Sequence, residues 1–365
     1  MKIVGLLGSL ALMAAWSPPL AAQTQPSSGA AVDDARAQAI ARYIAATKAP
    51  LKHPLREATN VERRSIEVGK RGDGASIEID LTFPKPAGGK PVPVVVLLHG
   101  GLPDEATIRP KAWRVFHDWG TALAANGVAA IMFDHTLGVP RRRLDQALAE
   151  TDTVLAWLAK EGAGRGLDTA RLAVFVFSAG GLFVPELLSD GRPLRADRVA
   201  MFYPSTGVVP GSPTAAVTDA ALAARMSLST AAKRLASQRT QLLILRGGGD
   251  ALPGLLKLLD ETTAELLAAD VAFELINIPG APHNFDAATD SAEVQSAIDR
   301  ALAFDPDDRW HQVSQSVAQR RPSMAINLAQ PTAVHPQFID DPGRSAQHVS
   351  QLCNPLLDEL FFALR

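Results

Sequence analysis

The chain has little of three things that many proteins depend on: cysteine, net charge and long apolar segments. Cys353 is the single cysteine among 365 residues, so no internal disulfide can form, and its apolar surroundings predict a buried structural thiol. A chain of this length can bury a large core without disulfides, so the lack of disulfides does not exclude an oxidising compartment. The formal net charge of −2 gives no basic field for binding nucleic acid or an anionic membrane surface.

The sequence also lacks the usual patterns for metals and cofactors. No pair of histidines has the spacing of metal ligands, and no glycine-rich loop has the Walker or dinucleotide pattern. We therefore expect neither a metal nor a cofactor.

The N-terminus has the residue order of a secretory signal. Lys2 precedes an apolar run of about a dozen residues, Ile3 to Trp16, and the small residues Ala21 and Ala22 follow it. The run is too short to span a bilayer, and no cysteine for a lipid anchor comes after it. We predict cleavage after Ala22 and export to the periplasm or the medium, with no membrane span in the mature protein. A buried N-terminal helix is the alternative.

Behind residues 1–22, the chain divides into three parts. Residues 23–75 form a polar linker and a helical segment, with a helix over Val32–Lys48. Residues 76–304 form the main domain. Residues 305–365 form a polar, proline-punctuated tail that is expected to pack back on the domain by its last helix.

Solid apolar runs alternate with helical patterns from residue 92 onward, which is typical of parallel strands buried on both faces. The alternating segment Ser76–Phe83 is typical of a half-buried antiparallel edge strand. The sequence therefore predicts an α/β fold: an open, mostly parallel sheet with an antiparallel start and helices on both faces. The expected strands are Val92–Leu98, Val128–Phe133, Leu172–Phe177, Val199–Tyr203, Gln241–Leu245 and Ala272–Ile278, and the expected helices include Lys111–Asn126, Leu144–Lys160 and Ala179–Leu188.

One segment, Thr214–Gln238, is helical but longer than a single crossover helix requires. It could form cap helices over the carboxyl ends of the strands, where open α/β sheets place their sites. A plain crossover helix between two strands is the alternative interpretation.

Three reactive residues follow the ends of predicted strands. Ser178 ends the run VFVFS, Asp250 follows the strand Gln241–Leu245, and His283 follows the last strand. Parallel strands bring their carboxyl ends to one edge of a sheet, so these side chains can meet. Histidine can take the proton of a serine near neutral pH, and an aspartate can orient the imidazole and stabilise its charged form.

The same edge offers donors for an oxyanion. The backbone N–H of Ala179 lies at a helix N-terminus directly after Ser178, and Gly101 can supply another from the loop after its strand. The small residues that follow Ser178 allow a sharp turn.

These motifs, His99-Gly100-Gly101, Ser178-Ala179-Gly180-Gly181, Asp250 and His283, resemble the α/β-hydrolase superfamily, and within it the dienelactone-hydrolase-like and acyl-peptidase-like esterases. The likeness covers roughly residues 76 to 304, in the serine–acid–histidine order of these hydrolases. It implies Ser178 as nucleophile, His283 as base, Asp250 as its orienter, and oxyanion donors at Gly101 and Ala179. It also implies that His99 braces the oxyanion loop.

Two positions depart from the family pattern. The nucleophile turn usually reads Gly-x-Ser-x-Gly, and here Val176 replaces the first glycine, which demands wider packing or a shifted helix. His99-Gly100-Gly101-Leu102 lacks the third glycine of the lipase motif, which favours the dienelactone-like or peptidase-like branch.

Several other residues are candidates for roles in the site. Asp260 or Asp286 could replace Asp250 as the acid. Leu102, His135 and Tyr203 could line the substrate pocket. Arg141-Arg142-Arg143 could bind a substrate carboxylate, although a basic run is more often a solvated face.

The sequence thus predicts an exported serine hydrolase that acts on small-molecule carboxylic esters. A short-peptide peptidase with the same triad is one alternative. A non-catalytic hydrolase-like binding protein is the other, and Val176 is its only support. The oligomeric state stays open.

Overall fold

The computed structural model describes residues 41, 44–55, 61–84, 90–103, 108–139, 141–196, 198–238, 240–303 and 325–328. The predicted signal segment, most of the predicted helix Val32–Lys48, Cys353 and the last helix of the tail lie outside the described residues. Residues 44–48 are helical. No helix within the described ranges has the length and apolar character needed to cross a membrane.

A single large sheet organises the part of the chain that the structure describes. Its order is β1-β2-β5-β3-β7-β8-β9-β10-β11, with β1 and β2 antiparallel and every pair from β5 to β11 parallel. The strands are β1 (Val61–Lys70), β2 (Ser76–Pro84), β3 (Val92–Leu98), β5 (Ala129–Phe133), β7 (Leu167–Phe177), β8 (Arg198–Phe202), β9 (Gln241–Gly247), β10 (Phe273–Ile278) and β11 (Ala325–Leu328). Two short strands, β4 (Leu102–Pro103) and β6 (Gly138–Val139), pair separately beyond the main sheet.

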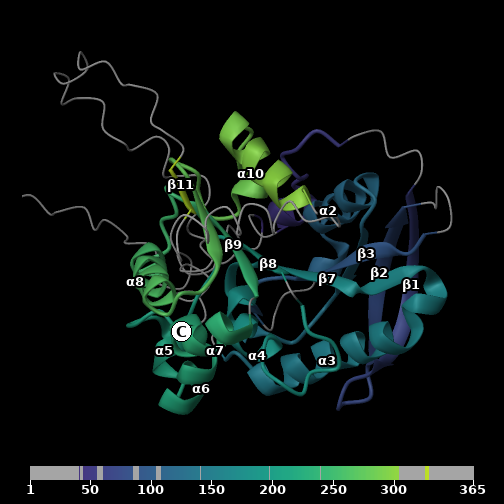
Figure 1. The fold of residues 1–365 in the computed structure, drawn as a ribbon, viewed down its shortest axis with the longest axis horizontal. Helices are drawn as coiled ribbons and strands as arrows, with labels where there is room; N and C mark the ends of the chain where they lie inside the picture. Colours follow the sequence, from purple (N-terminus) through teal and green to yellow (C-terminus); the bar gives the residue numbers. More distant parts are fainter. Residues whose placement is uncertain are drawn as a thin grey trace, which may run out of the picture.

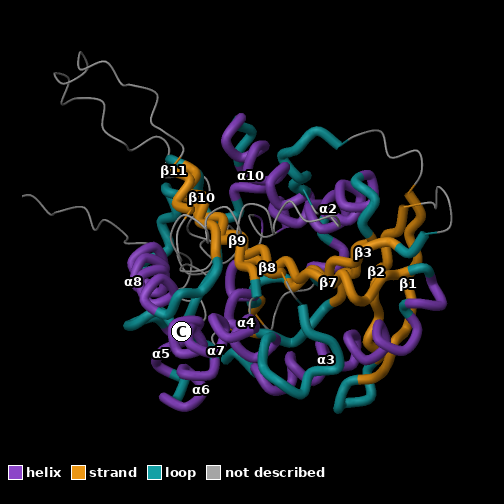
Figure 2. The backbone as a smooth tube through the Cα atoms, in the orientation of Figure 1, coloured by secondary structure: helices purple, strands orange, loops and turns teal. Residues whose placement is uncertain are grey.

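Helices cover both faces of the sheet (Figures 1 and 2). α2 and α10 pack on one face, and α3, α4, α7 and α8 pack on the other, so the core divides into two clusters. The helices are α2 (Arg114–Ala125), α3 (Leu144–Glu161), α4 (Val184–Leu187), α5 (Pro213–Ala216), α6 (Ala220–Arg225), α7 (Leu228–Gln238), α8 (Leu255–Ala268), α9 (Phe285–Ala288) and α10 (Ala292–Leu302), with 3₁₀ turns η1 (Pro110–Ala112), η2 (Ala163–Arg165) and η3 (Ser178–Phe183).

The central strands are apolar on both sides because both of their faces are covered. All five residues of β5 are buried, and β3 is buried from its second residue to its last. This pattern confirms the predicted open, mostly parallel α/β sheet with an antiparallel start.

The antiparallel start is longer than the sequence predicted. β1 lies within residues 23–75, which the sequence analysis described as a linker and helical segment, and it forms the outer edge beside β2. Five of the ten positions of β1 are exposed, while its apolar residues Ile66 and Val68 pack against one of the two core clusters.

The helix predicted over Ala179–Leu188 is interrupted. The chain instead makes the 3₁₀ turn η3 and then the short helix α4. Pro185 explains the difference, since it lacks an N–H and its ring clashes with the carbonyl four residues earlier in a continuous α-helix.

The segment Thr214–Gln238 forms three helices, of which the last is the predicted crossover helix. α7 is the crossover helix, because Ala231, Ala232 and Leu235 pack into the core under the sheet. The short helices α5 and α6 precede it as an addition, and α5 is linked by Thr214 to Arg142, beyond β6.

Candidate active site

Ser178 stands at the carboxyl end of the central strand β7 on a sharply bent backbone. Its φ is +51°, a region that non-glycine residues seldom occupy. The turn fits only because of its glycines: a Cβ on Gly180 would lie 2.7 Å from the carbonyl oxygen of Leu98 and 2.8 Å from that of His99. One on Gly181 would lie 2.5 Å from the carbonyl oxygen of Ser205. Close packing against two neighbouring strand ends therefore holds the serine in place.

The three predicted reactive residues form one hydrogen-bonded chain. The distance from Ser178 Oγ to His283 Nε2 is 2.9 Å, and that from His283 Nδ1 to Asp250 Oδ2 is 2.6 Å. The other carboxylate oxygen of Asp250 accepts the backbone N–H of Leu252 at 3.0 Å. His283 and Asp250 are buried, whereas Ser178 is partly exposed. This geometry suits proton transfer from the hydroxyl to an oriented imidazole.

The two other candidate acids occupy different places. Asp260 lies on α8 with an exposed side chain and pairs with Arg246. Asp286 is buried and bonds to Trp119 and Tyr203, not to a ring nitrogen of His283. Among the three, Asp250 is the carboxylate bonded to the imidazole.

A fixed peptide group lies beside the serine, in the loop after β3. His99 Nδ1 bonds to the carbonyl oxygen of Gly100 at 2.5 Å. In a trans peptide the C=O and the following N–H point in opposite directions, so this bond turns the N–H of Gly101 away from His99. A Cβ on Gly100 would lie 3.1 Å from Ser178 Cβ, so the loop touches the turn that carries Ser178.

A second histidine holds His99 in this orientation. The rings of His99 and His135 stack with centroids 3.5 Å apart, and both are fully buried. The backbone N–H of His135 can only donate, so His99 Nε2 accepts it at 3.2 Å, and the proton of the neutral ring stays on Nδ1, facing Gly100. Burial lowers the pKa of His99 to about 3 and the pKa of His135 well below its ordinary value, so both are neutral at physiological pH.

A buried polar cluster supports His283 from behind. The Tyr203 ring centroid lies 4.7 Å from that of His283, and the Tyr203 hydroxyl donates to Asp286 at 2.9 Å. The indole N–H of Trp119 donates to the other oxygen of Asp286 at 2.9 Å. Burial raises the pKa of Asp286, and these two donors oppose that rise. Nothing in the sequence pattern indicates this cluster, because the bonded residues are 83 and 167 positions apart in the chain.

The burial of His135 and Tyr203 contradicts the prediction that these two residues line the substrate pocket. His135 is 0% exposed and stacks on His99, so it supports the loop after β3 and does not line an open pocket. Tyr203 is also almost wholly buried, with its hydroxyl turned to Asp286. Leu102 keeps a small exposed fraction of 8% on β4, next to Gly101.

Val176 replaces the usual glycine and is accommodated inside the core. Its side chain is fully buried in the same cluster as Ala179, Leu182 and Phe183. The segment after the serine is the 3₁₀ turn η3, so the helix that would normally approach this position begins only at Val184.

The described residues give no metal site: they contain no group of three or more His, Cys, Asp or Glu side chains placed to hold an ion. The site therefore consists of the Ser178–His283–Asp250 chain, the Gly100–Gly101 loop beside it and their buried supports.

Comparison with known proteins identifies the architecture. Esterase B from Lactobacillus rhamnosis superimposes with a TM-score of 0.57 at 17% identity, covering 80% of this chain and 97% of that one. A bacterial heroin esterase gives a TM-score of 0.58 at 18% identity, covering 75% and 90%. Esterase Est2 from Thermogutta terrifontis gives 0.53 at 17% identity, covering 68% and 92%. The chain has the α/β-hydrolase fold.

Sequence comparison adds less to this α/β-hydrolase assignment. No family model matches the chain. A non-reducing polyketide synthase, stbA from Stachybotrys bisbyi, is 30% identical over 125 residues, which is 33% of this chain. The chain spans 6% of the length of that relative.

Proposed function

We propose that the protein is a serine hydrolase that cleaves carboxylic esters through an acyl-enzyme on Ser178. The observation that carries the proposal is the hydrogen-bonded chain from Ser178 Oγ through His283 to Asp250, at 2.9 and 2.6 Å, on a turn with positive φ. The solved structures of similar fold are named esterases, which favours an ester over a peptide as substrate.

In the first half of the reaction, Ser178 Oγ attacks the ester carbonyl carbon while His283 Nε2 takes the hydroxyl proton. The carbonyl oxygen becomes an oxyanion that accepts hydrogen bonds from the N–H groups of Gly101 and Ala179. Asp250 stabilises the resulting imidazolium. The carbon–oxygen bond to the alcohol then breaks, and His283 returns its proton to the leaving alkoxide.

In the second half, water attacks the acyl-enzyme while His283 again accepts a proton. Collapse of the second tetrahedral intermediate releases the carboxylic acid and returns the proton to Ser178. His99 contributes by holding the Gly100–Gly101 peptide in the orientation that leaves an N–H for the oxyanion.

We also propose that the protein is exported, with cleavage after Ala22. The order of charged, apolar and small residues at the N-terminus supports this. N-terminal sequencing of the protein recovered from a secreting host tests it, and a mature chain that begins at Met1 contradicts it.

Hydrolysis of a p-nitrophenyl ester series, from acetate to decanoate, tests the proposed activity. We expect wild-type turnover, and a loss on the order of 10⁴-fold or more in kcat for Ser178→Ala. Asp250→Asn should lose on the order of 10⁴-fold, because the imidazole loses its orienting carboxylate. Asp260→Asn, which changes an exposed carboxylate, is the matched control and should keep the wild-type rate. Full activity in Ser178→Ala contradicts the proposal.

A further inference from the structure

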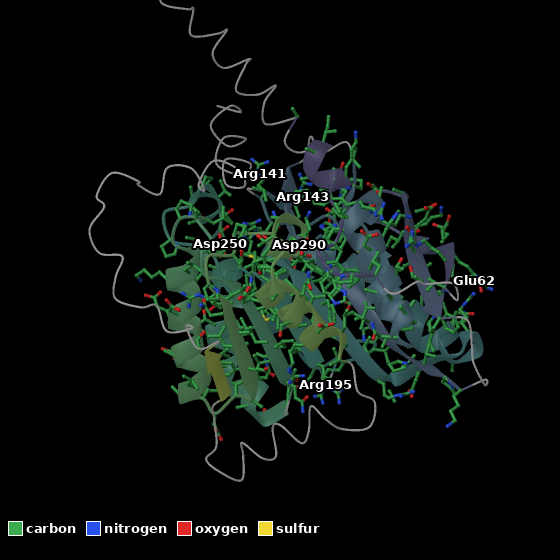
Figure 3. All side chains as sticks on the ribbon, turned by 90° about the horizontal axis from the view of Figure 1, so that it is seen from above. Glu62, Arg141, Arg143, Arg195, Asp250 and Asp290 are labelled. Carbon is green, nitrogen blue, oxygen red and sulfur yellow. The ribbon has the colours of Figure 1, made fainter. Side chains whose placement is uncertain are left out.

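The three consecutive arginines that precede α3 do not share one environment. Arg141 and Arg143 are exposed, whereas Arg142 between them is only partly accessible. In Figure 3, Arg141 and Arg143 lie toward the same end of the molecule as Asp250, and Arg195, which precedes β8, lies toward the opposite end. The run therefore stands at the carboxyl edge of the sheet, where the candidate active site is.

Arg142 holds its positive charge without a carboxylate partner among the described residues. Its Nη1 donates to the carbonyl oxygen of Gly138 at 3.1 Å, and its Nη2 donates to Thr214 Oγ1 at 3.0 Å. Both acceptors are neutral. The Nε atom is shielded from solvent and has no hydrogen-bond partner in the part of the chain that the structure describes.

This environment is costly for a guanidinium. Burial is what lowers the pKa of Arg142, to about 10, so the group still carries its charge at neutral pH. A charge withdrawn from water is stabilised only when an anion or several hydrogen bonds compensate for the lost hydration. A bound anion would supply the missing compensation.

The guanidinium lies against the oxyanion loop. A Cβ on Gly101 would be 2.7 Å from Arg142 Nη1, and one on Gly100 would be 3.5 Å from Ser178 Oγ. Two consecutive residues of one loop therefore contact the arginine and the nucleophile. Thr214, on the short helix α5, accepts a hydrogen bond from the other side of the guanidinium, so α5 also helps to position Arg142.

We propose that Arg142 binds a carboxylate of the substrate, so that the preferred substrates are esters that carry a free carboxylate group near the scissile bond. The inference rests on the proposed ester hydrolysis by Ser178. A carboxylate is the expected partner because its two oxygens match the planar N–H fork of a guanidinium.

Paired esters test the proposal. p-Nitrophenyl monoesters of succinate, glutarate and adipate are compared with the neutral butyrate, valerate and hexanoate esters, which places the charge on the acyl side. 4-Butyryloxybenzoate is compared with phenyl butyrate, which places it on the alcohol side. The variants are Arg142→Gln, Arg142→Lys and, as matched control, Arg141→Gln at the exposed neighbour.

For wild type, we expect kcat/KM for at least one charged ester to exceed that of its neutral partner by about tenfold or more. Arg142→Gln should lower kcat/KM for that ester by about 10- to 100-fold, the range expected for a hydrogen bond to a charged group. Its rate on the neutral partner should change by less than about threefold, since no carboxylate is lost there. Arg142→Lys should restore part of the preference, because it keeps the charge without the fork, and Arg141→Gln should keep all of it.

Three results overturn the inference while leaving the proposed function intact. The first is equal wild-type rates on charged and neutral esters, and the second is an equal loss on both classes in Arg142→Gln, which would make the residue a support of the loop. The third applies if Arg142→Gln does not fold. In that case, the result that overturns the inference is that free glutarate inhibits the wild-type enzyme no more strongly than its neutral diamide, glutaramide. Absence of Ser178-dependent hydrolysis of every ester would instead overturn the proposed function itself.

Discussion

Gly180→Ala tests how precisely the strand ends hold Ser178. The added methyl group would lie 2.7 Å from the Leu98 carbonyl oxygen and 2.8 Å from the His99 carbonyl oxygen. Ordinary contact begins at 3.4 Å, so the nucleophile turn must move by 0.6 to 0.7 Å. Neither neighbour can rotate away, because both atoms belong to backbone.

The size of both effects follows from this displacement. Overpacking of a tight interior contact costs about 1–3 kcal/mol of unfolding free energy. Catalytic geometry tolerates roughly 0.5 Å, and a displacement of 1 Å costs on the order of 10²-fold in rate. We therefore expect Gly180→Ala to lose about 1–3 kcal/mol of stability and roughly 30- to 100-fold in kcat.

Urea unfolding and steady-state ester hydrolysis measure the two losses. Gly164→Ala is the control, because no atom lies within 4 Å of its Cβ position and its φ is not positive. It should keep full activity and gain or lose less than about 1 kcal/mol. Wild-type stability and kcat in Gly180→Ala would refute the packing described for the nucleophile turn.

Three further predictions concern the buried supports. The pKa of His99 is lowered to about 3 in the folded protein. As pH falls below about 6.5, His99 therefore binds a proton only in the unfolded state, and the free energy of unfolding falls. At pH 5 this histidine accounts for about 2 kcal/mol of that loss. His99→Asn should reduce by that amount the difference in urea-unfolding free energy between pH 8 and pH 5, and an unchanged difference contradicts the buried neutral ring. Tyr203→Phe removes one of two side-chain donors to Asp286; it should cost about 1.5–3 kcal/mol in the same assay, and a cost near zero would mean that the carboxylate is otherwise satisfied. Val176→Gly should cost about 2–4 kcal/mol by opening a cavity in the core without raising kcat, and a gain in kcat would show that the valine impairs the site.

The fold was predictable for the strands that are buried on both faces, because such strands are continuous runs of apolar residues. β3, β5 and β7 are continuous apolar runs, and each was found to within a few residues apart from the extended start of β7. β1 was missed because its half-buried, heavily charged sequence is also compatible with a polar surface segment. Pro185 does signal the break between η3 and α4: proline fits only the first turn of a helix, so a helix that contains Pro185 cannot begin as early as Ala179.

The grouping of the three reactive residues could also be predicted from the strands. Ser178, Asp250 and His283 each follow a strand, and parallel strands bring such positions to one edge. The supports were not readable, because their bonds join residues distant in sequence: Tyr203 to Asp286, and His99 to His135.

The environment of Arg142 illustrates the same limit. Three adjacent arginines have no sequence feature that separates the partly buried one from its exposed neighbours. Its burial arises from the loop at Gly101, from β6 and from α5, which come together only in the folded chain.

The most direct test of the central claim is the site of covalent labelling by a fluorophosphonate probe. The wild-type protein is incubated with the probe, and intact mass followed by peptide mapping locates the adduct. The account predicts one adduct per chain, on Ser178, and none on Ser178→Ala. A folded wild-type protein that stays unlabelled, or that is labelled on another residue, would contradict the assignment of Ser178 as the nucleophile.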